Sequence, residues 1–150
     1  MPKSDELQAI FVPPGGGTAI EFLGVTHKLT SSQTGGALYL FESTFQAGDA
    51  NRLHRHRRED EYAFVIEGAL EVRLPAETRV LEAGGVSRLP RGLAHALRNP
   101  LSTPSRYLFL AAPGGLEHFF DALESARRAG ELNAETSARL AADIDLEWLE

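Results

Sequence analysis

Two histidines separated by a single residue, His54 and His56, most constrain how this chain can fold. On an extended strand, side chains two residues apart point to the same face, so both imidazoles can reach one point. Glu61 follows five residues after His56, an odd offset that would place it on the opposite face of a continuous strand. The charged run at residues 57–60 indicates a turn or bulge that resets this phase. Three ligand-type side chains can then converge on one metal ion.

A second stretch, residues 84–99, offers a fourth ligand. Pro90-Arg91-Gly92 predicts a tight turn, and His95 follows it at the start of a short apolar strand. A neighbouring strand would bring His95 to the same metal ion. Judged from the residues alone, the carboxylate ligand could also be Glu59 or Asp60 in place of Glu61.

These two stretches resemble the two motifs of the cupin superfamily. The first family pattern is Gly, five residues, His-x-His, three or four residues, Glu, six residues, Gly. The second is Gly, five residues, Pro-x-Gly, two residues, His, three residues, Asn. Every motif position is matched here, by Gly48, His54, His56, Glu61 and Gly68 and then by Gly84, Pro90, Gly92, His95 and Asn99. The resemblance favours Glu61 over its two acidic neighbours, which are expected to be solvated or paired with Arg57 and Arg58.

Length and pattern predict an all-β domain. A chain of 150 residues and 16.3 kDa is expected to form one domain, residues 1–150. Short segments rich in apolar, β-branched and aromatic residues alternate with turn signals, which is typical of a barrel or sandwich. The resemblance implies a cupin double-stranded β-helix, or jelly-roll barrel, over about residues 18–113. The motif glycines are expected at turns that need positive φ.

The two ends of the chain have their own patterns. Residues 8–12 form a short apolar strand candidate. Apolar residues at 116, 119, 120 and 123 predict an amphipathic helix, with Gly130 as its stop and Asn133 as the N-cap of a second helix. Two short C-terminal α-helices are therefore expected over about residues 115–145. The apolar residues after them are expected to pack on the barrel.

Charge and composition exclude some classes of binding partner. The net charge of -6 argues against nucleic acid and against an anionic membrane surface. No apolar run approaches membrane-spanning length, and the first residues lack the apolar core of a signal peptide, so a cytoplasmic protein is expected. A helix-turn-helix segment is not expected, because the 24 residues before the main strands are β-like and leave no room for one. His27 and His118 match no motif and are not expected to be ligands.

The donor set constrains the metal. Three neutral imidazoles and one carboxylate suit one divalent ion among Fe, Mn, Ni, Cu, Co and Zn, and the absence of cysteine excludes a thiolate site. Protons should compete with the metal, so affinity is expected to fall steeply below about pH 6. A carboxylate that detaches from the metal could act as a catalytic base, which makes Glu61 the candidate catalytic residue.

Residues 34–42 and 113–117 extend the resemblance to small cupins related to quercetin 2,3-dioxygenase. This similarity implies a metal-dependent oxygenase acting on a small flavonol, enediol or diketone-like compound. Two alternatives stay open because fold does not fix function. One is a non-redox cupin isomerase or lyase, and the other is a small-molecule binding module without turnover.

A homodimer is expected from the strand that carries Glu61. If Glu61 points into the barrel, alternation sends Tyr62, Phe64 and Ile66 outward. A strand that is apolar on both faces needs cover on both faces. The C-terminal helices are too short to cover everything, and cupins commonly pair, so a second subunit is the expected cover. The alternative is that the N-terminal strands fold over this face.

Overall fold

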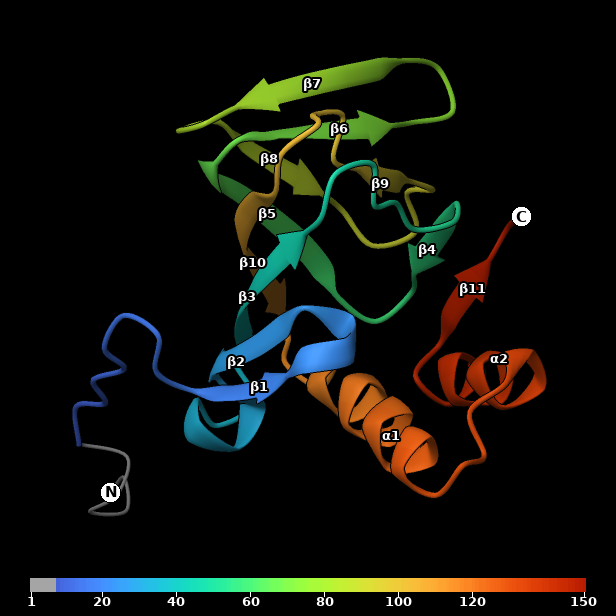
Figure 1. Cartoon of the computed structure of the whole chain (residues 1–150). Coiled ribbons are helices and arrows are strands. Elements are labelled where there is room, and N and C mark those ends of the chain that lie inside the picture. Colours follow the sequence, from blue (N-terminus) through green and yellow to red (C-terminus); the bar gives the residue numbers. More distant parts are fainter. Residues whose placement is uncertain (1–7) are drawn as a thin grey trace.

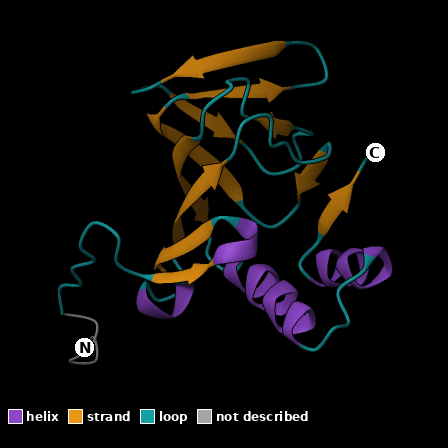
Figure 2. Ribbon diagram, in the orientation of Figure 1, coloured by secondary structure: helices purple, strands orange, loops and turns teal. Residues whose placement is uncertain are grey.

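A computed structural model describes residues 8–150 of the chain (Figure 1). Its regular structure is mainly β-strands, and two α-helices lie near the C-terminus, before the last strand (Figure 2). This arrangement confirms the predicted all-β class with two C-terminal helices. Within the described part, no helix is long and apolar enough to cross a membrane.

Most of the barrel wall is one antiparallel sheet with the strand order β1-β2-β3-β10-β5-β8. β10 is central because it pairs with β3 on one side and β5 on the other. In the order of the sheet, these strands span Thr18–Ile20, Val25–Leu29, Tyr39–Phe45, Ser105–Ala112, Asp60–Glu67 and Val86–Leu89.

Two smaller sheets complete the structure. One has the order β7-β6-β9, and the other pairs β11 with β4. An isolated bridge between His54 and His95 ties β4 to the segment that leads into β9. The strands of the two sheets span Thr78–Glu82, Ala69–Arg73 and Ala96–Arg98, and then Leu146–Trp148 and His54–His56.

Alternation along β5 sets the inside of the barrel. Glu61, Ala63 and Val65 are buried, whereas Phe64 and Ile66 are exposed, which confirms the predicted orientation. The strand starts at Asp60, after a bend that separates it from β4. That bend is the predicted phase shift, and it allows Glu61 to face the same interior as His54 and His56.

Gly68 shows why the first motif ends on glycine. Its φ is +85°, a left-handed conformation that L side chains rarely adopt. A Cβ atom at this position would also collide with the side chain of Ser105. Glycine is therefore required at the turn from β5 into β6 for two reasons, the backbone conformation and the lack of space for a side chain.

The helices close one end of the barrel. α1 spans Glu117–Arg128 and α2 spans Ala134–Asp143, and Figure 1 shows both beside the same end of the strands. Asn133 caps α2, because its side chain accepts a hydrogen bond from the Thr136 amide at 2.9 Å, as predicted. Phe119 and Leu123 on α1 are buried against the core, which agrees with the amphipathic pattern.

Two predictions at the ends of the chain are wrong. Residues 8–12 form no strand, because no strand within residues 8–150 pairs with this segment, and Phe11 is 89% exposed. In contrast, Leu146–Trp148 does form a strand, β11, which the sequence did not indicate. Its pairing with β4 places it next to two of the predicted metal ligands.

Candidate metal centre and its cavity

Three histidines meet inside the barrel. His54 and His56 lie on β4, and His95 is held beside His54 by paired backbone hydrogen bonds of 3.0 and 2.9 Å. All three side chains are buried, and one ligand atom from each lies within 4.8 Å of the other two. This group could bind a metal ion.

Hydrogen bonds orient each ring. The Nδ1 atoms of His54 and His95 lie 2.6 and 3.1 Å from the carbonyl oxygens of Arg52 and Leu93. A carbonyl only accepts, so these Nδ1 atoms carry the proton and each neutral ring presents its Nε2 lone pair. The Nδ1 atom of His56 lies 2.7 Å from a Glu59 carboxylate oxygen, the carboxylate–histidine arrangement that commonly supports a metal ligand.

The free ring nitrogens fit a metal ion. The Nε2 atoms of His56 and His95 are buried and have no hydrogen-bond partner among residues 8–150. Buried polar atoms rarely stay unpaired, so a group at this point would have to satisfy them. A divalent cation can accept both lone pairs, and the donor chemistry of these rings suits it.

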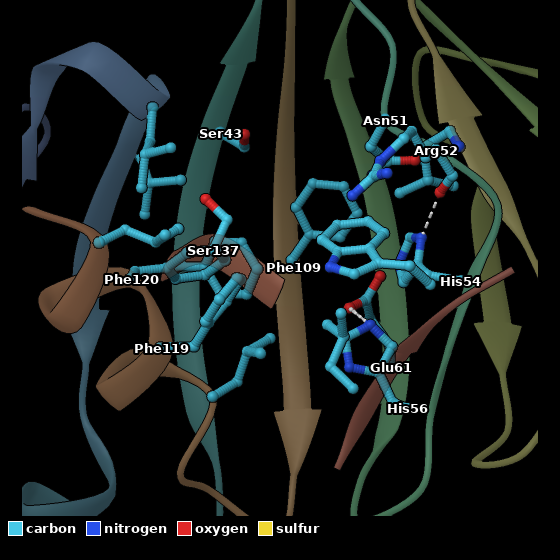
Figure 3. Close-up of a pocket in the computed structure, with 18 of the residues that line it drawn as sticks. Ser43, Asn51, Arg52, His54, His56, Glu61, Phe109, Phe119, Phe120 and Ser137 are labelled. Atoms are coloured by element: carbon cyan, nitrogen blue, oxygen red, sulfur yellow. Dashed lines mark hydrogen bonds and ion pairs between the residues drawn. The ribbon is translucent and has the colours of Figure 1, made fainter. Parts of the chain in front are cut away.

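Glu61 lies beside the same ring nitrogens. One carboxylate oxygen is 3.4 Å from Nε2 of His56, and the other is 3.8 Å from Nε2 of His95. The structure thus brings together all four side chains expected as ligands. Figure 3 shows Glu61 with His54 and His56 at one end of a cavity. Metal coordination by these four residues stays a prediction.

The acids that precede Glu61 behave differently from the expectation. Glu59 is buried and bonded to His56, so the prediction that it would be solvated or paired with arginine is wrong. Asp60 pairs with Arg91 instead of the adjacent arginines. Arg57 and Arg58 reach across to Glu147 and Asp145 near the C-terminus.

An apolar cavity of about 330 Å³ adjoins the histidines. Its volume lies at the lower end of the range for small-molecule sites. In Figure 3, Phe119 and Phe120 lie on the side away from His54 and His56, and Phe109 lies between the two sides. The two helical phenylalanines come from α1, so this helix forms a wall of the cavity in addition to closing the barrel.

Sequence patterns missed the contribution of the C-terminal strand to this cavity. Trp148 and Leu146 line it from β11, and Arg52 lines it from the segment before β4. Arg52 also lies over the Trp148 ring, at 4.4 Å from its centroid. The only local signal was an aromatic residue between leucines, which equally well describes packing on the barrel.

Comparison with known proteins identifies the family of this fold and site. Residues 41–111 match the family described as Cupin domain, and the match contains all four candidate ligands. This segment is a cupin domain. The structure of KdgF from a Halomonas species is 24% identical, with a TM-score of 0.59 over 73% of this chain and 97% of that chain. The double-stranded β-helix of cupins is therefore the architecture of the barrel.

Two further relatives of the cupin are informative. The tetracenomycin polyketide synthase protein TcmJ of Streptomyces glaucescens is 30% identical over 92 residues, which are 60% of this chain and 62% of that protein. The chain thus spans less than two thirds of this relative. A sugar phosphate isomerase from Silicibacter pomeroyi, also a cupin, is 20% identical with a TM-score of 0.51 over 59% of each chain. That similarity shows the fold alone.

Burial and neighbouring charges shift the pKa values of the three histidines in different directions. Burial lowers the pKa of His54 to about 3, and repulsion from His95 adds to this effect. Burial also lowers the pKa of His95, although the Glu61 charge opposes it. For His56, burial would lower the pKa, but the hydrogen bond to Glu59 and the charge of Glu61 outweigh it and raise the pKa. His56 is therefore the imidazole of the three whose protonated form the site stabilises.

This difference predicts how metal affinity depends on pH. His54 and His95 are already neutral near pH 7, so metal binding should displace one proton, from His56, rather than three. Below the raised pKa of His56, the logarithm of the Zn²⁺ dissociation constant should rise by about one per pH unit. Competition with a fluorescent chelator between about pH 5.5 and 8 measures this slope.

The variant Glu59→Gln provides the control for this pH dependence. Glutamine can still accept a hydrogen bond from Nδ1–H of His56, but it carries no charge. The pH at which the slope begins should therefore move to a lower value. A slope of two or three in the unmodified protein would contradict the assignment of neutral His54 and His95.

Proposed function

We propose that this cupin binds one divalent metal ion through His54, His56, His95 and Glu61 and acts as a dioxygenase on a small, mainly apolar compound. The compound is a flavonol, an enediol or a diketone. The observation that carries the proposal is the apolar cavity ending on the buried histidine and carboxylate cluster. Fe, Mn, Ni, Cu, Co and Zn all suit this donor set.

The cavity lining favours an aromatic or aliphatic substrate over a sugar phosphate. The lining is largely phenylalanine, leucine and valine side chains, and the polar groups concentrate around His54. A phosphate would need arginine or lysine contacts or a group of backbone amides. Arg52 is the single cationic side chain among the lining residues of the described chain, and the Trp148 ring already occupies one side of it.

The similarity to a polyketide synthase protein supports the diketone class. Polyketides are built from repeated ketone units, so their intermediates and products carry β-diketone and enol groups. Such a group presents two adjacent oxygens to a metal, while the carbon framework fills an apolar pocket. The resemblance to quercetin dioxygenase-like cupins supports the oxygenase reaction.

The residues of the site have separable roles under this proposal. When bound, the metal ion would supply Lewis acidity and a place for dioxygen to react with the substrate. His54, His56 and His95 would hold it, and Glu59 would orient His56. Glu61 would accept the acidic proton of the enol or of the carbon between two ketones. The phenylalanines would exclude water and position the substrate framework.

Oxygen uptake with defined metals tests this function. Protein purified without a histidine tag is stripped of metal and reloaded separately with each of the six ions. Each form is then mixed with 3-hydroxyflavone, dibenzoylmethane or a reductone enediol. We expect substrate-dependent oxygen uptake with a redox-active ion and none with Zn²⁺. Isomerised product without oxygen uptake would instead indicate the non-redox enzyme, and tight binding without any product would indicate a binding module.

Neutralising Glu61 should affect turnover strongly. Glu61→Gln keeps the size of the side chain but removes the base, so turnover per bound metal should fall by about 10²-fold or more. Glu67→Gln is the matched control, because Glu67 lies on the same strand and is exposed. Measuring metal content alongside turnover separates a lost base from a lost ligand. Unchanged turnover per metal would exclude Glu61 as the base.

A further inference from the structure

The C-terminal strand forms one wall of the cavity. In the pairing of β11 with β4, Leu146 lies opposite His56, Glu147 opposite Arg55, and Trp148 opposite His54. Because side chains alternate along a strand, Leu146 and Trp148 face the cavity while Glu147 faces outward. A residue about 90 positions from the first motif thus stands directly beside a candidate ligand.

Ion pairs and stacking fix the position of Trp148. Glu147 accepts hydrogen bonds from Arg55 at 2.9 Å and from Arg57 at 2.8 Å on the outer side of the strand. The Leu149 amide bonds to the Leu53 carbonyl at 2.8 Å. On the inner side, the Trp148 ring lies 5.5 Å from that of His54, centroid to centroid. The indole is therefore held from three directions.

The indole N–H of Trp148 lacks a hydrogen-bond partner. Its Nε1 atom is buried, and no described residue accepts from it. A buried tryptophan N–H usually has an acceptor, because leaving it unpaired costs free energy. The two unpaired histidine nitrogens nearby can be explained by a metal ion, but an indole N–H only donates and cannot bind a cation. Because Trp148 lines the cavity, an acceptor oxygen or nitrogen atom of a bound ligand can satisfy this N–H.

We propose that Trp148 donates a hydrogen bond to an oxygen atom of the ligand bound at the metal centre. This inference rests on the proposed function and names a recognition residue for it. A diketone, enediol or hydroxy-ketone has such an acceptor oxygen next to an apolar framework. A hydrocarbon of equal shape lacks it and would leave the N–H unpaired. Trp148 thereby selects oxygenated ligands and fixes which oxygen turns toward β11.

One atom can be changed to test this role. Trp148 is the single tryptophan of the chain, so growth on 3-benzothienylalanine replaces only the indole N–H by sulfur and preserves the ring shape. The Zn²⁺-loaded protein is used, because zinc does not support redox turnover and binding can be measured at equilibrium. The probe is dibenzoylmethane, titrated calorimetrically. We expect the sulfur-containing protein to bind about tenfold more weakly than the unmodified protein.

Further measurements separate recognition from structure. Zinc stoichiometry and the melting temperature should be the same with either ring, since the packing is unchanged. In Zn²⁺-loaded protein labelled with ¹⁵N, the single indole N–H resonance should shift when dibenzoylmethane is added. Trp148→Phe, which keeps an aromatic ring next to His54, should reproduce the weaker binding.

The outcomes distinguish the two proposals. Binding within twofold of normal in both the sulfur-containing protein and Trp148→Phe would overturn the role of Trp148 while leaving the proposed function intact. If the unmodified Zn²⁺ protein does not bind dibenzoylmethane, or binds it equally well without zinc, the diketone function and the inference that rests on it both fail.

Discussion

Replacing His56 and His95 together with alanine should abolish stoichiometric metal binding. The two Nε2 atoms removed are the buried, unpaired nitrogens of the site. Loss of a mere supporting partner of a metal ligand typically costs about 10–100-fold in affinity, so loss of two ligands should exceed that range. We expect that His54 and Glu61 alone do not hold the ion in competition with a chelator.

Metal analysis after dialysis measures this effect. Plasma mass spectrometry should find close to one ion per chain in the unmodified protein and almost none in the double variant. His118→Ala is the control, because His118 is exposed and is not one of the candidate ligands. Far-UV circular dichroism should stay β-rich, since the barrel strands do not depend on these rings. Full metal content in the folded double variant would show that the ion binds elsewhere.

The second large effect concerns assembly: we expect the cupin to be a dimer that pairs through the outer face of its large sheet. Phe64 is 40% exposed and Val86 is 60% exposed, and they lie opposite each other on β5 and β8. Leu108 on β10 extends the same row on the other side of Phe64. Tyr62 and Leu110 form the next row. Tyr62, Leu108 and Leu110 are half-buried beside these two exposed side chains. An apolar patch across three strands is typical of an interface.

The described chain leaves this face uncovered. The apolar side chains of α1 line the cavity instead, so the helix does not protect the outer face of β5. β1 lies at the opposite edge of the sheet from β8, and residues 8–12 form no strand. The alternative cover, N-terminal strands folded over this face, is thus disfavoured by the strand order.

Sedimentation equilibrium tests the dimer. The unmodified chain should have about twice its mass of 16.3 kDa. The double variant Tyr62→Glu with Phe64→Glu should be monomeric, since two buried charges would be unpaired at the interface. Val80→Glu is the matched control. Val80 is also an apolar residue and is 54% exposed, but it lies on β7 in another sheet. A monomer at tens of micromolar, or dissociation by the control, would refute this interface.

The motif pair predicted the interior of the barrel well, because the direction of each motif side chain follows from its spacing along a single strand. A His-x-His spacing fixes a shared face on any strand, and a two-residue period fixes which residues of β5 point inward. The phase shift before Glu61 was also predictable, since four successive charged residues rarely continue a strand buried on one face. These patterns depend on neighbours in sequence, which the sequence displays directly.

What the sequence could not predict depends on distant partners. Glu59 lies in a charged run of the kind found in solvated turns. Only the position of His56 in the folded chain makes Glu59 a buried hydrogen-bond acceptor. β11 has three residues and a glutamate in the middle, so its strand state comes from pairing with β4 rather than from propensity. Trp148 was missed as a cavity residue for the same reason.

The pairing of β11 with β4 has a kinetic consequence for the newly made chain. Arg55 and Glu147, which face each other in this pair, are separated by 92 positions in the sequence. Closing so long a loop costs entropy before any contact compensates for it, so we expect these contacts to form late in folding. We therefore expect the wall of the cavity beside His54 to be among the last parts to become ordered. Until then the histidines would be open to solvent, and metal could enter without passing the finished wall.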